Sequence, residues 1–135
     1  MTQLAVDVLA APEAISDLTG TLMNFLEDQH VDARATHHVA MIIEEFLTNL
    51  GTHGNCRDVP VRVSITVEPA RVRGEIVDSG PPYDPRQAPD PDLDVPAMDR
   101  PEGGLGLFLV RRFSSSLDYV RRNDQNHTTF AVARN

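Results

Sequence analysis

The hydrophobic period of this chain changes near Val59, and no other feature limits its fold as strongly. Before this point, apolar residues recur every three or four positions, which predicts helices over 12–29 and 31–53. After it, apolar and polar residues alternate over 59–68 and 71–78, which predicts two antiparallel strands joined by a short turn. A chain whose helices are followed by strand hairpins is expected to form an α+β fold.

The last third of the chain begins with a long irregular segment. Residues 79–104 are rich in proline and aspartate, and a connection of this length inside a compact domain is expected to be functional. We interpret it as a lid. Residues 104–116 then regain a helical pattern, while 117–123 and 128–134 alternate and predict a hairpin closed by a turn at 124–127.

These segments, together with a short alternating strand at 4–9, predict one domain over residues 1–135. Strands that follow one another through hairpins favour a mixed, mostly antiparallel sheet with helices on one face, which is a two-layer α/β sandwich. The content of 41% hydrophobic and 24% charged residues is that of an ordinary globular protein.

The charge balance excludes some classes of partner. A formal net charge of -8 repels phosphate backbones and anionic lipid surfaces, so we expect no nucleic acid and no membrane as partner. No stretch approaches the roughly 18 apolar residues of a membrane span. The single cysteine, Cys56, cannot form an internal disulfide. These features favour a cytoplasmic protein.

One predicted helix carries polar residues at a regular spacing. Glu45, Asn49 and His53 lie four residues apart and therefore on one stripe, whereas Glu44 is turned by roughly 100° toward solvent. A carboxylate, an amide and an imidazole in a row suit Mg²⁺ and phosphate binding. The alternative is an ordinary solvated face, although asparagine is a weak helix former. Gly51 is expected to interrupt this helix.

Two further motifs carry potential chemistry. Asp78 ends a predicted strand and Gly80 allows a sharp turn, so the carboxylate can accept a hydrogen bond from an exocyclic amine such as that of adenine. The alternative is a plain Asx turn. Gly104 and Gly106 open a helix and let backbone N–H groups approach a polyphosphate, or they simply provide a flexible entry to a core helix.

The order of these three elements in one small chain resembles the GHKL ATP-binding fold. The chain is more closely similar to bacterial anti-sigma-factor serine/threonine kinases of the RsbW and SpoIIAB type, from Ala11 to Arg134. The resemblance implies ATP and Mg²⁺ as cofactors and a lid over residues 81–102. It also implies a role for each matching residue, with Glu45 as general base, Asn49 as Mg²⁺ ligand, His53 near the phosphates, Asp78 with Gly80 at the adenine, and Gly104, Leu105 and Gly106 at the phosphates.

The function implied by this resemblance is phosphorylation of a STAS-type anti-sigma-factor antagonist, with a sigma factor or similar regulator as alternate ligand and a homodimer as possible assembly. Pro82 and Glu102 depart from the family pattern and favour the alternative of a catalytically silent, ATP-gated binding switch. A third hypothesis is a metal hydrolase built on His37, His38 and the glutamate pair, but adjacent histidines point about 100° apart on a helix.

Overall fold

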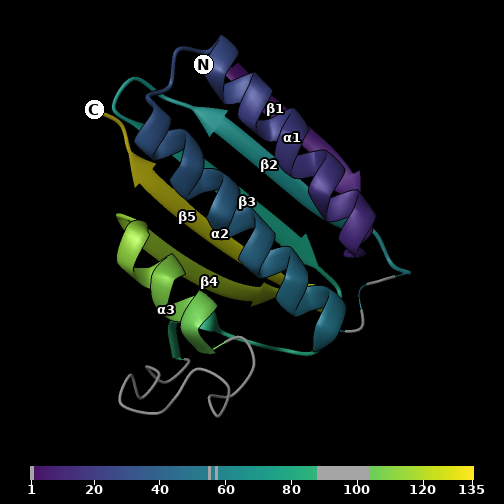
Figure 1. Cartoon of the computed structure of the whole chain (residues 1–135). Helices are drawn as coiled ribbons and strands as arrows, with labels where there is room; N and C mark the ends of the chain where they lie inside the picture. Colours follow the sequence, from purple (N-terminus) through teal and green to yellow (C-terminus); the bar gives the residue numbers. More distant parts are fainter. Residues whose placement is uncertain (1, 55, 57, 88–103) are drawn as a thin grey trace.

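The computed structural model describes residues 2–54, 56, 58–87 and 104–135 (Figure 1). Its helices and strands follow the predicted order. They are β1 (Thr2–Val8), α1 (Pro12–Asp28), α2 (Ala33–Thr52), β2 (Val61–Val67), β3 (Arg71–Asp78), the 3-10 turn η1 (Pro85–Gln87), α3 (Gly104–Phe113), β4 (Ser116–Arg122) and β5 (Gln125–Ala133).

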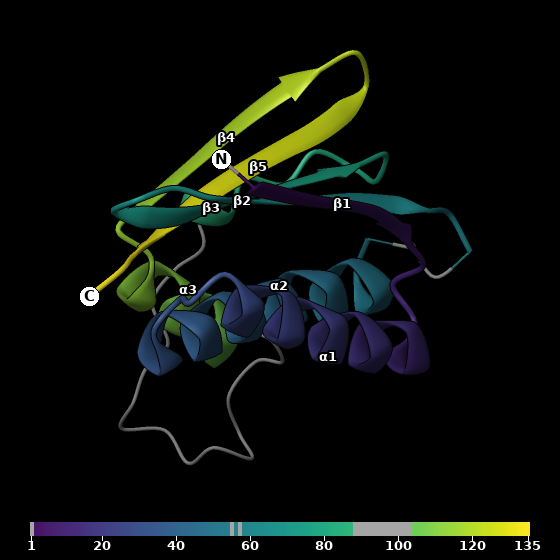
Figure 2. The ribbon, with the colours of Figure 1, turned by 90° about the horizontal axis from the view of Figure 1, so that it is seen from above.

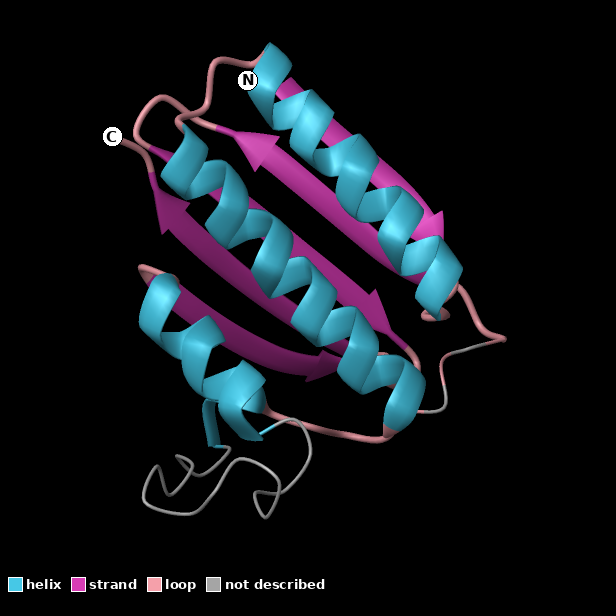
Figure 3. Cartoon of the chain, in the orientation of Figure 1, coloured by secondary structure: helices cyan, strands magenta, loops and turns pink. Residues whose placement is uncertain are grey.

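The strands form one five-stranded sheet in the order β1-β2-β3-β5-β4. Every neighbouring pair of strands in it is antiparallel. α1, α2 and α3 cover one face of this sheet, as Figure 2 shows from above and Figure 3 shows by element type. The predicted two-layer α+β sandwich is therefore confirmed.

The core lies between the two layers and follows from the strand alternation. In β3, Val72 and Ile76 are buried under the helices, while Arg71 and Arg73 on the opposite face are exposed. Full burial of a side chain of this kind stabilises the fold by about 1.5–3 kcal/mol. The core therefore requires the β3 register, because a slip by one residue would place arginines under the helices.

α2 is continuous, and the prediction that Gly51 interrupts it is wrong. Asp32 caps its first turn by accepting a hydrogen bond from the Ala35 N–H at 3.1 Å. The helix continues through Gly51 to Thr52, and at Gly51 it lies against Ala10, which precedes α1. A Cβ at position 51 would lie 2.2 Å from the Ala10 carbonyl oxygen. This glycine serves close packing rather than helix termination.

The hairpin between β4 and β5 turns earlier than predicted. Asn123 and Asp124 have φ of 54° and 61°, so they form a two-residue turn with both residues in the left-handed region, as in type I′ hairpins. The predicted turn at 124–127 is therefore wrong, and β5 already begins at Gln125. This shift places Asn126 in the sheet, directly opposite Asp78 of β3.

The described part of the predicted lid is short. Residues 81–87 follow the end of β3 and finish in the η1 turn. Positions 88–102, which include Glu102, lie outside the described residues.

In the part of the chain that the structure describes, no helix combines the length and apolar character needed to cross a membrane.

Candidate nucleotide-binding site

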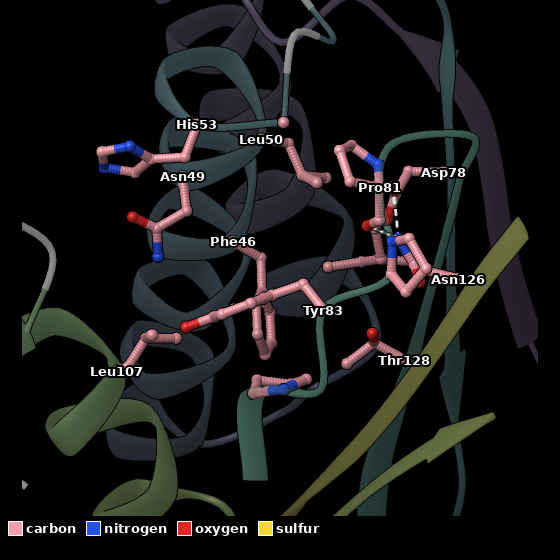
Figure 4. Close-up of a pocket in the computed structure, with 14 residues that line it drawn as sticks. Phe46, Asn49, Leu50, His53, Asp78, Pro81, Tyr83, Leu107, Asn126 and Thr128 are labelled. Carbon is pink, nitrogen blue, oxygen red and sulfur yellow. Dashed lines mark hydrogen bonds between the residues drawn. The ribbon is translucent and has the colours of Figure 1, made fainter. Parts of the chain in front are cut away.

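A cavity of about 250 Å³ lies between α2, α3, the ends of β3 and β5, and the segment 81–85 (Figure 4). Its walls are mainly apolar, with a few polar groups, which is the usual make-up of a small-molecule site. It is lined by Phe46, Asn49, Leu50, His53, Gly54, Ile76, Asp78, Pro81, Pro82, Tyr83, Pro85, Leu107, Asn126 and Thr128.

Asp78 is the buried acid of this cavity, with 4% of its surface exposed. Its Oδ1 accepts hydrogen bonds from the Gly80 N–H at 2.9 Å and from Asn126 Nδ2 at 3.0 Å. The first of these bonds is the Asx turn that the sequence also allowed. Glycine suits this position, because a Cβ at position 80 would lie 3.0 Å from both Asp78 Oδ1 and the Gly54 carbonyl oxygen, which is closer than ordinary contact.

Asn126 was missed by the sequence analysis. Its amide contacts Asp78, the turn at Pro81 and two side chains of β4, Tyr119 and Arg121. The available signal was the Asn-Asp pair at 123–124, since both residue types tolerate the left-handed conformation of a two-residue hairpin turn. Locating the turn there puts Asn126 opposite the predicted adenine-binding aspartate.

Two predicted residues of α2 line the opposite side of the cavity. Figure 4 shows Asn49 and His53 one above the other on this helix, across from Asp78 and Asn126. His53 is the exposed C-cap residue of α2. Asn49 is half-buried, and its Nδ2 is fully buried without a hydrogen-bond partner among the described residues. A buried polar atom of this kind calls for a ligand or water.

Glu45 lies beside the cavity rather than in its lining. It is half-buried, whereas Glu44 is exposed, so the predicted division of the glutamate pair is confirmed. Its carboxylate packs on the first turn of α3, where a Cβ at Gly106 would lie 2.0 Å from Glu45 Oε2. Burial raises the pKa of Glu45, and the Glu44 carboxylate raises it further.

Gly104 and Leu105 are the first two residues of α3, and Gly106 follows them immediately before Leu107, which lines the cavity. The predicted site residues therefore gather around one cavity from three elements. Asn49, His53 and Asp78 line the cavity. Gly80 donates its N–H to Asp78, and Glu45 contacts the first turn of α3 beside the cavity.

ATP and Mg²⁺ fit the residues present. The apolar walls suit a purine ring, and buried Asp78 suits its amine. At the other end, Asn49 Nδ2, which has no partner among the described residues, suits a phosphate oxygen, and the amide oxygen of Asn49 is of the kind that binds Mg²⁺. Across residues 2–54, 56, 58–87 and 104–135, no three His, Cys, Asp or Glu side chains group to hold a metal. Mg²⁺ does not need such a cage, because it usually keeps waters and substrate phosphates.

His38 of α2 takes part in the packing between two helices. The His38 ring stacks on Phe113 of α3 with ring centroids 4.3 Å apart. Burial lowers the pKa of His38, and the nearby Arg34 cation lowers it further. His38 therefore packs α3 against α2, and the hydrolase hypothesis gains no metal-binding group from the described residues.

Residues 8–132 match the histidine kinase-like ATPase domain family. The chain belongs to this family, and membership in a family of ATPase domains implies that it binds ATP. It is 35% identical over 99 residues to the serine/threonine-protein kinase BtrW of Bordetella bronchiseptica, covering 72% of this chain and 70% of that protein.

Two solved structures share the fold. The RsbU and RsbW domains of a Mycobacterium tuberculosis protein match with a TM-score of 0.70 at 16% identity, over 100% of this chain and 33% of that one. The chain thus spans about a third of that protein's length. The SiaB-SiaC complex of Pseudomonas aeruginosa matches with a TM-score of 0.60 at 15% identity, over 96% and 89% of the two chains. These matches show that the chain shares its fold with both structures.

Proposed function

We propose that this chain is an ATP-binding anti-sigma regulatory factor that phosphorylates a serine or threonine of a STAS-type antagonist. The observation that carries the proposal is one cavity lined by both a buried carboxylate, Asp78, and Asn49, whose buried Nδ2 has no hydrogen-bond partner among the described residues. The 35% identity to a protein named as a serine/threonine kinase supports the same class of reaction.

The binding roles follow from the chemistry of each group. Asp78 accepts a hydrogen bond from the adenine amine, supported by Gly80, while the apolar walls hold the ring. The amide oxygen of Asn49 is the Mg²⁺ ligand, and His53 lies toward the phosphates. The N–H groups at Gly104 and Gly106 bind phosphate oxygens at the start of α3. Mg²⁺ neutralises phosphate charge when it is bound. The lid proposed over residues 81–102 begins with the described residues 81–87, and positions 88–102 lie outside the described residues.

Glu45 is the general base of the proposed reaction. Phosphoryl transfer depends on positioning and charge more than on a protein nucleophile, so the chain must mainly orient the hydroxyl and remove its proton. The ionised Glu45 carboxylate takes that proton from the attacking serine or threonine. The pKa of Glu45 is raised toward the working pH. A general base is most efficient when its pKa lies near that pH.

Partner switching is the proposed biological use of this reaction. The chain, acting as a single domain over residues 1–135 and as a homodimer, sequesters a sigma factor or similar regulator. Binding of the unphosphorylated antagonist releases that regulator, and phosphorylation of the antagonist returns the chain to it.

The test uses two adjacent glutamates as matched variants. The purified chain is incubated with Mg²⁺, ATP and a panel of purified STAS-domain proteins from the same genome, and phosphate transfer is measured on gels. Glu45→Ala is expected to lower the transfer rate by about 10²–10⁴-fold, the usual contribution of a general base, with ATP affinity unchanged in calorimetry. Glu44→Ala, on the exposed side, is expected to match the wild-type chain. Loss of ATP binding together with transfer in Glu45→Ala would assign Glu45 to binding or folding instead.

A second candidate function is the catalytically silent switch, in which ATP orders the lid and controls a protein interface. Pro82 favours it, because this proline lines the cavity where the family pattern has a more pliable glycine. Normal ATP binding by the wild-type chain, with no transfer to any STAS protein of the panel, would select this function.

A further inference from the structure

Asn126 is hydrogen-bonded at both ends of its amide and is 3% exposed. Its Nδ2 donates to Asp78 Oδ1 at 3.0 Å and to the Pro81 carbonyl oxygen at 2.9 Å. Its Oδ1 accepts from the Tyr119 hydroxyl at 2.5 Å and from Arg121 Nη1 at 3.2 Å. The amide orientation is fixed by these partners, since an arginine can only donate and a carbonyl can only accept.

These bonds leave Asp78 with one oxygen for a ligand. Oδ1 already accepts from Gly80 and Asn126, whereas no described residue donates to Oδ2. The two donors act on one side of the carboxylate and therefore fix its rotation about the side-chain bond. An oxygen held in this way meets a donor in the cavity at a set angle, which a freely rotating carboxylate would not do.

The same amide secures the turn that follows β3. Asn126 holds the Pro81 carbonyl, and Arg121 Nη1 donates to the Gly80 carbonyl at 2.7 Å. The β4–β5 hairpin thus binds the carbonyl groups of two consecutive peptides, Gly80–Pro81 and Pro81–Pro82. Movement of the hairpin would shift the Asp78 carboxylate and the first residues of the 81–87 segment together.

We propose that Asn126 is a positioning residue that sets the purine specificity of the cavity, by holding Asp78 so that its second oxygen meets the exocyclic amine of adenine. This inference rests on the proposed function, and it adds to the site a residue of β5, the strand paired with β3. A purine with a carbonyl in place of that amine presents an acceptor to an acceptor and is rejected. The discrimination requires a fixed carboxylate, because a rotated one can avoid the repulsion.

The test compares ATP with inosine triphosphate, which carries a carbonyl where ATP has the amine. Both affinities are measured by calorimetry in Mg²⁺ for the wild-type chain, Asn126→Ala and the control Gln125→Ala. Gln125 is the neighbouring residue, and its side chain makes only an exposed 3.4 Å contact with Ser79 Oγ among its described contacts. The wild-type chain and the control are expected to prefer ATP by about 10–100-fold, the range of a hydrogen bond to a charged group. Asn126→Ala is expected to lose most of this preference.

Asn126→Leu provides a second variant in case the alanine variant does not fold. It fills a similar volume but offers no donor to Asp78, so the preference for ATP is also expected to fall. Circular dichroism verifies that each variant is folded.

The outcomes separate this inference from the proposed function. A folded Asn126 variant that binds both nucleotides more weakly but keeps the wild-type preference would overturn the inference alone, leaving Asn126 a structural residue. A wild-type chain that binds neither nucleotide would overturn the proposed function as well. Equal affinities of the wild-type chain for ATP and inosine triphosphate would contradict the hydrogen bond between Asp78 and the adenine amine, and with it this inference.

Discussion

Gly106→Ala should separate the stability of this fold from its phosphate transfer. A Cβ at position 106 would lie 2.0 Å from Glu45 Oε2, so the carboxylate must move by about 1.4 Å to reach ordinary contact at 3.4 Å. The clashing group is the end of a flexible side chain, which can rotate away at low cost. Alanine also favours a helix over glycine by about 0.5–1 kcal/mol. The melting temperature is therefore expected to stay equal or to rise by a few degrees.

The transfer reaction should respond in the opposite direction. A displacement of about 1 Å in a positioned group can cost about 10²-fold in rate, so Gly106→Ala is expected to lower the transfer rate by this factor or more. ATP affinity, measured by calorimetry, is expected to change less than the rate, because alanine keeps the backbone N–H that is proposed to bind phosphate. Wild-type transfer in a folded Gly106→Ala chain would refute the base role of Glu45 or its contact with α3.

The matched control for this variant is Gly51→Ala. Its Cβ would lie 2.2 Å from the Ala10 carbonyl oxygen, which is backbone and cannot rotate away. Thermal unfolding is therefore expected to show a lower melting temperature for Gly51→Ala than for the wild-type chain. An equal effect of the two alanines on stability would contradict the distinction between a flexible and a rigid neighbour.

Two further predictions concern stability. Because burial raises the pKa of Glu45, protonated Glu45 favours the fold at acid pH, and this contribution is lost as the pH rises through the raised pKa. Glu45→Gln should therefore raise the melting temperature at pH 8 and make less difference near pH 4; the same difference at both pH values would contradict the shift. Gly74→Ala should lower the free energy of unfolding in urea by about 1–3 kcal/mol, because its Cβ would lie 2.3 Å from Phe130 ring atoms. The double variant Gly74→Ala/Phe130→Leu should regain part of that loss, and no recovery would show that the ring is not the obstacle.

The features that follow from a single element could be predicted from the sequence. The helical period of 3.6 residues is rigid, so it separates Glu44 from Glu45 and aligns Asn49 and His53 without any tertiary information. The alternation in 71–78 likewise predicted the bounds of β3, since a half-buried strand needs one apolar face.

The features that depend on two elements could not be predicted in this way. Gly51 was expected to interrupt α2, but the contact with Ala10 gives it a packing role that no local pattern reveals. The two-residue turn at 123–124 was missed because 124–127 is also polar, and polarity alone does not fix a hairpin register. That error hid Asn126, whose role depends on its position across from Asp78.

The most direct test of the account is a calorimetric titration with Mg²⁺ and a non-hydrolysable ATP analogue of the wild-type chain and of Asp78→Asn. In the variant, the amide oxygen is expected to stay with the donors of Gly80 and Asn126, so its NH₂ group would meet the adenine amine donor to donor. The wild-type chain is expected to show saturable binding, and Asp78→Asn is expected to bind about 10–100-fold more weakly. No binding by the wild-type chain, or equal affinity of the two chains, would contradict this expectation.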